Sequence, residues 1–289
     1  MDTWILALQS IVQGIVQGIT EWLPISSTGH LKLLDALWPM AIGDAFKEMF
    51  EVVIQLGSIL AVVILYFKKL NPFSKAKSAK ENQDTLRLWG KVLVASIPAA
   101  IAGFLIDDWM NSLFARNVKV EVAVIAVALI VYGVGFIIIE TVQKTIRVDD
   151  VQRLPFKTAF GIGAFQMLAL IPGTSRSGST ILGATLLGLS RTAAAEFSFF
   201  MAIPVMLGAS CLKSAKLFYE IVFEGLTIQG SEWLALAIAT VVSFVVSVLA
   251  IRFLMSFIQK HDFKVFGWYR IVLGILLIVC LSVVPTLFN

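Results

Sequence analysis

Charged residues are scarce in this chain of 289 residues: Asp, Glu, Lys and Arg make up only 15%. A typical soluble domain has about 25%. Hydrophobic residues reach 58%, and the mean hydropathy is +0.88. This composition excludes a soluble protein and predicts an integral membrane protein. The net charge of +4 is modest and its basic residues lie in loops between apolar stretches, so no nucleic-acid partner is expected.

Cysteine is also rare. Cys211 and Cys280 are the two cysteines, and they lie far apart in apolar stretches. No CxxC pair and no Cys/His cluster exists in the sequence, which argues against a zinc site. Both thiols are therefore expected to be free and packed among apolar side chains.

Six long apolar stretches predict transmembrane helices, because a bilayer-spanning helix needs about 20 mostly apolar residues. They are residues 46–67, 88–110, 118–139, 197–212, 233–255 and 268–287. Two further apolar segments, 4–38 and 158–190, are interrupted near their middle by Pro, Gly and hydroxyl residues. Non-helical backbone at membrane depth is tolerated only where protein or a wet cavity covers it. Each segment is therefore predicted to be a re-entrant helix–loop–helix.

The order of these elements predicts an internal repeat within a single membrane domain, residues 1–289. Repeat one covers about 1–140 and repeat two about 158–289. Each repeat holds one re-entrant helix-loop-helix plus three transmembrane helices, and three is an odd number, so the second repeat must be inverted. The predicted fold class is an all-α integral membrane protein with two inverted-topology repeats, in which a site usually lies at the repeat interface near mid-membrane.

Basic residues gather in three loop regions, which are 68–91, 140–157 and 252–270. Arg270 is counted in the third of these regions. The loops predicted on the opposite side carry only four basic residues. By the positive-inside rule, the three basic regions face the cytoplasm and both chain termini face outward.

The first break brings an acid, hydroxyls and an imidazole together. Gln17 and Glu21 are four residues apart, so they share one face of a helix. The break then supplies the side chains of Ser26, Ser27, Thr28 and His30. Such groups suit acid–base or nucleophilic chemistry, and ionisable groups in a membrane segment are costly and usually functional. The alternative is a structural break whose hydroxyls satisfy its own backbone.

The second break surrounds one arginine with hydroxyls and glycine. Its candidate phosphate-binding residues are Thr174, Ser175, Arg176, Ser177 and Gly178. Backbone donors at a helix N-terminus together with a guanidinium form an anion site. The structural alternative is that Arg176 pairs with a carboxylate such as Glu21. Because the nucleotide motif GxxxxGK[ST] is absent, the sequence favours a lipid phosphate or pyrophosphate as substrate.

Two weaker candidates lie in the spans that follow the breaks. Glu51 and Gln55 are four residues apart near the start of a span, and Glu51 is a candidate ligand for a metal or a water. The alternative for Glu51 is that its carboxylate reaches toward the membrane interface. Glu196 lies near Arg191 and is predicted to form a structural ion pair with it.

At these residues the sequence resembles the bacterial undecaprenyl-diphosphate phosphatase family, also called the bacitracin-resistance family. The resemblance covers essentially the whole chain and is most specific at 18–31, 50–61 and 172–180. It implies hydrolysis of undecaprenyl pyrophosphate, a polyprenyl pyrophosphate lipid, to the monophosphate and phosphate. This step recycles the lipid carrier for peptidoglycan synthesis and confers bacitracin resistance. It also implies a divalent cation, magnesium or calcium, and a multi-pass protein of the bacterial cytoplasmic (inner) membrane with its active site open to the outer face.

The resemblance assigns roles by position. It implies that Glu21 is an essential acid and Ser27 the nucleophile. It also implies that His30 is an acid/base and that Arg176 binds phosphate. Glu21 is also the expected metal ligand. The family's first acidic residue is Gln17 here, which puts in doubt any mechanism that needs two carboxylates on that helix face. Two routes stay open: attack by Ser27 on the terminal phosphorus, with His30 or Glu21 accepting its proton, and direct activation of a water by His30 or Glu21.

Three other functions compete with hydrolysis. A lipid-phosphate transporter or flippase is the strongest, because inverted repeats with broken helices are a transport architecture. A second lipid-phosphatase superfamily uses two histidines, but His261 is predicted on the cytoplasmic side, away from His30. A purely structural protein would not explain Glu, His and Arg in membrane breaks. A homo-oligomer is compatible with the sequence, which does not decide the oligomeric state.

Overall fold

The computed structural model describes residues 3–115, 117–142 and 145–283, apart from the side chains of 107–109, 111 and 114–115. The described chain is helical and holds no β-strand beyond one isolated bridge. The helices are α1 (Thr3–Thr20), α2 (Ser27–Leu37), α3 (Asp44–Leu65), α4 (Phe67–Leu70), α5 (Ala79–Ala115), α6 (Val118–Val142), η1 (Val151–Arg153), α7 (Phe156–Gln166), η2 (Met167–Leu170), α8 (Arg176–Leu186), α9 (Arg191–Phe223), α10 (Gly230–Ile258) and α11 (Lys264–Val283).

The six predicted membrane spans are confirmed. Among the described residues, six helices are long and apolar enough to cross a bilayer, namely α3, α5, α6, α9, α10 and α11. Each contains or closely overlaps one of the apolar stretches found in the sequence. The chain is thus a multi-pass membrane protein of the all-α class.

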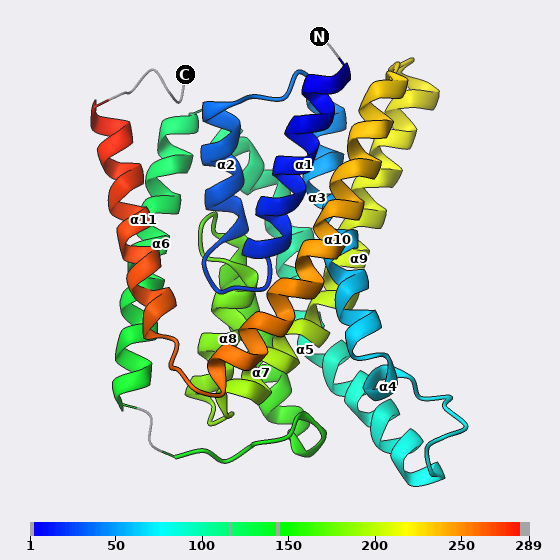
Figure 1. Ribbon diagram of the computed structural model, residues 1–289, viewed down its shortest axis with the longest axis vertical. Coiled ribbons are helices and arrows are strands. Elements are labelled where there is room, and N and C mark those ends of the chain that lie inside the picture. The colour runs from blue at the N-terminus through cyan, green and yellow to red at the C-terminus, as the bar shows by residue number, and fades with distance from the viewer. Residues whose placement is uncertain (1–2, 116, 143–144, 284–289) are drawn as a thin grey trace.

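The two interrupted segments form the helix pairs α1–α2 and α7–α8, which enter the bundle from opposite ends (Figure 1). The α1–α2 pair descends from the end where α1 begins and α11 ends. The α7–α8 pair rises from the other end, where α4 and the connection between α10 and α11 also lie (Figure 1). The two breaks meet in the middle of the bundle. This arrangement is consistent with inverted repeats.

Each break ends at a serine that caps the next helix in a strained conformation. Ser26 has φ 76° and Ser175 has φ 69°, and no other non-glycine residue in the described part of the chain has a positive φ. Each serine hydroxyl accepts a hydrogen bond from the backbone N–H three residues further on. Gln17 and Gln166 lie nine residues before these two caps. The shared spacing and geometry support a relation between the two segments.

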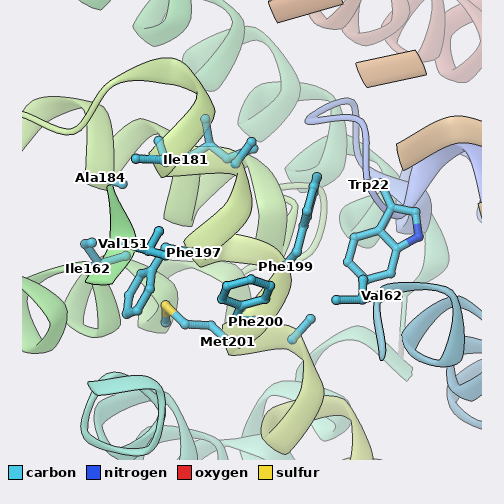
Figure 2. Close-up of a cluster of buried hydrophobic side chains, with 14 of the residues drawn as sticks. Trp22, Val62, Val151, Ile162, Ile181, Ala184, Phe197, Phe199, Phe200 and Met201 are labelled. Atoms are coloured by element: carbon cyan, nitrogen blue, oxygen red, sulfur yellow. The ribbon is translucent and has the colours of Figure 1, made fainter. Parts of the chain in front are cut away.

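A large cluster of buried apolar side chains lies next to the first break (Figure 2). Trp22 directly follows Glu21 and is fully buried, with its ring packed edge-on against Phe199 at a centroid distance of 5.1 Å. Other members of the cluster are Val62, Phe197, Phe200 and Met201. Burial of the Trp22 ring against Phe199 therefore anchors the break to α9.

Two ion pairs differ from the sequence prediction. Glu196 pairs with Lys69, whose Nζ lies 2.8 Å from Oε2, and not with Arg191. Arg191 pairs instead with Glu140, with 2.6 Å between Nη2 and Oε2. The predicted pair is wrong because residues five apart on a helix point to different faces, whereas partners three or four apart share one. The two pairs tie α9 to α4 and to α6.

Glycines allow helices in this bundle to approach to backbone contact. A Cβ atom built at Gly57 of α3 would lie 2.2 Å from the carbonyl oxygen of Thr240 on α10. A Cβ at Gly163 of α7 would lie 2.1 Å from the carbonyl oxygen of Ala95 on α5. Membrane helices associate through such close packing, because lipid tails remove the hydrophobic drive between helices.

We expect Gly57→Ala to lower the free energy of unfolding by about 1–3 kcal/mol, because the new methyl group meets the rigid backbone of α10. Gly208→Ala is the matched control, since a Cβ there meets no atom within 4 Å. The control gains helix propensity and is expected to be neutral or slightly stabilised. The measurement is the thermal midpoint of each purified variant in the same detergent. Equal midpoints for the two variants would contradict the close contact between α3 and α10.

Candidate active site

Arg270 of α11 joins the two breaks. Its side chain is fully buried; Nη1 donates to the carbonyl oxygen of Pro24 at 3.1 Å, and Nη2 donates to those of Gly173 and Thr174 at 3.0 and 2.9 Å. These carbonyl groups belong to backbone that has left its helix, so the guanidinium supplies donors that the breaks need. Its sequence-based placement in a basic loop is wrong, because α11 already begins at Lys264.

Glu21 is the centre of the polar cluster. Oε1 accepts a hydrogen bond from Nη2 of Arg176 at 2.9 Å. Oε2 accepts from the hydroxyl of Ser27 at 3.1 Å and from the amide Nε2 of Gln17 at 2.9 Å. The shared helix face predicted for Gln17 and Glu21 is confirmed by this contact. The two carboxylate oxygens together accept hydrogen bonds from three different side chains. The Glu21 side chain is only 6% exposed.

Arg176 begins α8 and reaches from the second break to the first. Besides its contact with Glu21, Nη1 donates to the backbone oxygen of Ser198 on α9 at 2.9 Å. The guanidinium carbon lies 5.5 Å from the centroid of the Trp22 ring. Its Nε is buried and has no hydrogen-bond partner among the described residues. The ion pair between Arg176 and Glu21, which the sequence offered as a structural alternative, is present. The Nε–H of Arg176 still remains as a donor for an anion.

The hydroxyls of the second break mainly hold backbone. The Ser177 hydroxyl donates to the backbone oxygen of Glu21 at 3.0 Å. The Ser175 hydroxyl accepts from the N–H of Gly178 at 3.1 Å, and Thr174 is buried with its carbonyl bound by an arginine. Ser26 has the equivalent capping role in the first break. The sequence predicted these residues to bind phosphate, and in the structure the hydroxyls of Ser26, Ser175 and Ser177 already have hydrogen-bond partners within the protein.

The imidazole of His30 faces α11. Nδ1 lies 2.7 Å from the backbone oxygen of Ser26, and Nε2 lies 2.7 Å from the hydroxyl of Tyr269. Ser27, three residues earlier on α2, has its hydroxyl on Glu21. Of the two bases that the sequence offered for Ser27, it is Glu21 that contacts it. Thr28, the hydroxyl between them, is exposed.

Three contacting residues were not found from the sequence. Ser198, Tyr269 and Arg270 come from α9 and α11, far along the chain from the break residues that they touch. Only Arg270 carried a signal, which is a lone charge inside an apolar span. Glu51 and Gln55 lie on α3, and in the described part of the chain no hydrogen bond or ion pair joins their side chains to Glu21 or Arg176.

The cluster fits a divalent cation only as a site shared with substrate. In the described residues no group of three or more His, Cys, Asp or Glu side chains is placed to hold a metal. Glu21 supplies one carboxylate, and the amide Oε1 of Gln17 is buried without a hydrogen-bond partner there. Carboxylate and amide oxygens suit magnesium and calcium, and magnesium is commonly held by one or two carboxylates plus substrate phosphates. The oxygen donors of Glu21 and Gln17 match magnesium binding by one carboxylate together with substrate phosphates.

The chain matches a known family and named relatives along nearly its whole length. The family described as bacitracin resistance protein BacA matches residues 10–276, which include both breaks and Arg270. An undecaprenyl-diphosphatase of Latilactobacillus sakei is 53% identical over 94% of this chain and 96% of its own length. Undecaprenyl-diphosphatase 1 of Clostridioides difficile is 51% identical over 96% and 98%. An undecaprenyl-diphosphatase of Lactiplantibacillus plantarum is 54% identical over 93% and 96%.

The family match reaches into every membrane helix and includes the polar cluster between the two breaks. It agrees with the resemblance that the sequence motifs carried. The protein therefore belongs to the bacitracin resistance protein BacA family.

Proposed function

We propose that this protein hydrolyses undecaprenyl pyrophosphate to undecaprenyl phosphate and inorganic phosphate. The observation that carries this function is the contact of Glu21 with both Ser27 and Arg176 where two membrane breaks meet. A nucleophile, a base and a guanidinium stand there at membrane depth, where a lipid phosphate group is accessible. The family match and undecaprenyl-diphosphatases about half identical to this chain support the same substrate. The reaction returns the lipid carrier to peptidoglycan synthesis and accounts for bacitracin resistance.

The start of α8 is the proposed pyrophosphate-binding element. Backbone N–H groups at a helix N-terminus carry a partial positive charge and favour anions. Arg176 stands at this N-terminus and keeps Nε as a buried donor without a partner among the described residues. In a site that excludes water, such fixed donors stabilise the charge that develops on phosphoryl oxygens in the transition state.

The contact between Ser27 and Glu21 supports a covalent route. The hydroxyl oxygen of Ser27 attacks the terminal phosphorus while its proton passes to Oε2 of Glu21. The bond from that phosphorus to the bridging oxygen breaks, and undecaprenyl phosphate leaves. Water then hydrolyses the phosphoserine and restores the hydroxyl. The competing route has Glu21 or His30 activate a water directly, and the two routes differ in whether Ser27 is required.

We further propose that a magnesium or calcium ion binds together with the substrate. Glu21 and the Oε1 atom of Gln17 would hold it, in combination with phosphate oxygens. When bound, the ion neutralises part of the negative charge on the pyrophosphate. Gln17 thereby supplies a neutral oxygen ligand where the family pattern has an acid, and Glu21 supplies the only carboxylate in the described cluster.

The proposed location is the bacterial cytoplasmic membrane, with the site open to the outer face. The described residues of the three basic regions, apart from the buried Arg270, lie toward the end of the bundle from which α7 enters (Figure 1). The positive-inside rule places that end in the cytoplasm. The α1–α2 pair, which carries Glu21, Ser27 and His30, then opens from the outer side.

A lipid-phosphate transporter or flippase is the second candidate function. The observation that favours it is the entry of two re-entrant pairs from opposite ends toward one central site (Figure 1). The alignment of Ser27 with Glu21 favours hydrolysis, because transport does not require a base on a hydroxyl.

Arg176→Lys is expected to reduce phosphate release from undecaprenyl pyrophosphate by about a hundred-fold or more. Lysine lacks the planar donors of the guanidinium, which stabilise the charge that develops on the phosphoryl oxygens. Lysine keeps a positive charge next to Glu21, so the fold is expected to survive. Arg252→Lys, at an exposed position of α10, is the matched control and should retain wild-type turnover. Phosphate release is measured in detergent with and without EDTA, and EDTA should abolish it. No release by folded wild type with added magnesium or calcium would favour the transporter.

Ser27→Ala tests the covalent route. We expect turnover to fall by roughly a hundred-fold or more, because the alanine variant has no hydroxyl from which Glu21 can take a proton. Ser282→Ala, on the exposed surface near the end of α11, serves as the control for removing one serine hydroxyl. If Ser27→Ala keeps nearly wild-type turnover, a water molecule attacks phosphorus and the covalent route is wrong.

A further inference from the structure

Tyr269 on α11 makes a close and well-defined contact with His30. Its hydroxyl lies 2.7 Å from Nε2, and the two rings are almost parallel, with 7° between their planes and 5.6 Å between their centroids. The tyrosine is half-exposed, whereas its neighbour Arg270 is fully buried. One turn of α11 therefore holds both the backbone of the breaks and the imidazole of His30.

The two contacts of His30 determine its tautomer. The partner of Nδ1 is the carbonyl oxygen of Ser26, which only accepts, so Nδ1 carries a proton. In the neutral imidazole Nε2 is then the acceptor, and the phenol of Tyr269 donates to it. Because Nδ1 is held by backbone, Nε2 is the nitrogen through which His30 exchanges protons.

The helix that carries His30 is only partly buried. Gly29 is the only buried residue within α2, and most of its other side chains are partly or fully exposed. Ser27 and His30 are three residues apart and share a face of this helix. The hydrogen bond from Tyr269 fixes the imidazole plane one turn from the Ser27 hydroxyl, while the cap by Ser26 and ion pairs to α3 and α6 hold the rest of α2.

We propose that Tyr269 is a positioning residue for the phosphatase reaction and acts through His30. Its hydroxyl holds Nε2 in the acceptor form and keeps the imidazole facing α11 until substrate binds. This proposal rests on the proposed hydrolysis of a lipid pyrophosphate. It assigns a role to a residue outside both breaks.

The first test is spectroscopic and does not need activity. The chain has two histidines, so His261→Asn leaves His30 as the only imidazole in protein labelled with nitrogen-15 histidine. His261 is exposed, and its ring stacks on Phe257 at the end of α10. We expect a protonated Nδ1 signal and an unprotonated, hydrogen-bonded Nε2 signal. Tyr269→Phe should move the Nε2 signal toward that of a free acceptor, and an unchanged signal would overturn the proposal.

The second test is kinetic. Tyr269→Phe should lower kcat roughly five-fold with little change in KM, which corresponds to the loss of one neutral hydrogen bond. In a His30→Gln background the same change should cost nothing further, since the two residues act as a unit. Tyr219→Phe, on the exposed face of α9, is the control and should match wild type.

The kinetic outcomes separate this proposal from the proposed function. Wild type that releases no phosphate would refute hydrolysis, and the His30 spectrum would be unaffected by that result. Active wild type with a fully active Tyr269→Phe variant would overturn the positioning role alone. An equal loss from Tyr269→Phe with and without His30 would also overturn it, because the tyrosine would then act independently.

Discussion

Backbone groups that lose their helical partners at membrane depth are the constraint on which this structure depends. Lipid offers them no hydrogen bonds, so protein side chains must do so. Arg270 satisfies three carbonyl groups from both breaks, and the Ser177 hydroxyl satisfies the backbone oxygen of Glu21. Ser26 and Ser175 cap the helices that follow. These contacts fix the place where Glu21 and Arg176 meet. The hydrogen bonds that satisfy the backbone of the two breaks therefore also assemble the site.

The buried ion pair of Glu21 and Arg176 has additional neutral hydrogen-bond partners. Desolvating a carboxylate and a guanidinium costs several kcal/mol per ion, and their attraction offsets this only when further hydrogen bonds complete the geometry. Gln17 and Ser27 donate hydrogen bonds to Glu21, and the backbone oxygen of Ser198 accepts one from Arg176. A second carboxylate at position 17 would place a like charge against Glu21 unless it were protonated or bound to a cation. The amide of Gln17 avoids that repulsion and leaves an oxygen directed to other ligands.

Local patterns in the sequence predicted the spans, the two re-entrant segments and the shared face of Gln17 and Glu21, because each depends on residues close together in the chain. Contacts across the bundle were not predictable in this way. Tyr269 and Ser198 lie in ordinary apolar helices, and no periodicity reveals which break they touch. Arg270 was misplaced because a charge near the end of a span looks like a loop residue. The sequence also does not distinguish serines that cap a helix, such as Ser175, from a serine such as Ser27 that contacts the central acid.

Arg270 holds both breaks together and thereby assembles the site. Its direct test is Arg270→Met, which keeps the length of the side chain and removes all three donated hydrogen bonds. Phosphate release and the thermal midpoint are measured on the same detergent preparation. We expect both to fall, since each lost hydrogen bond from a charged donor to a buried carbonyl removes about 1.5–3 kcal/mol. A variant with wild-type turnover and an unchanged midpoint would contradict it.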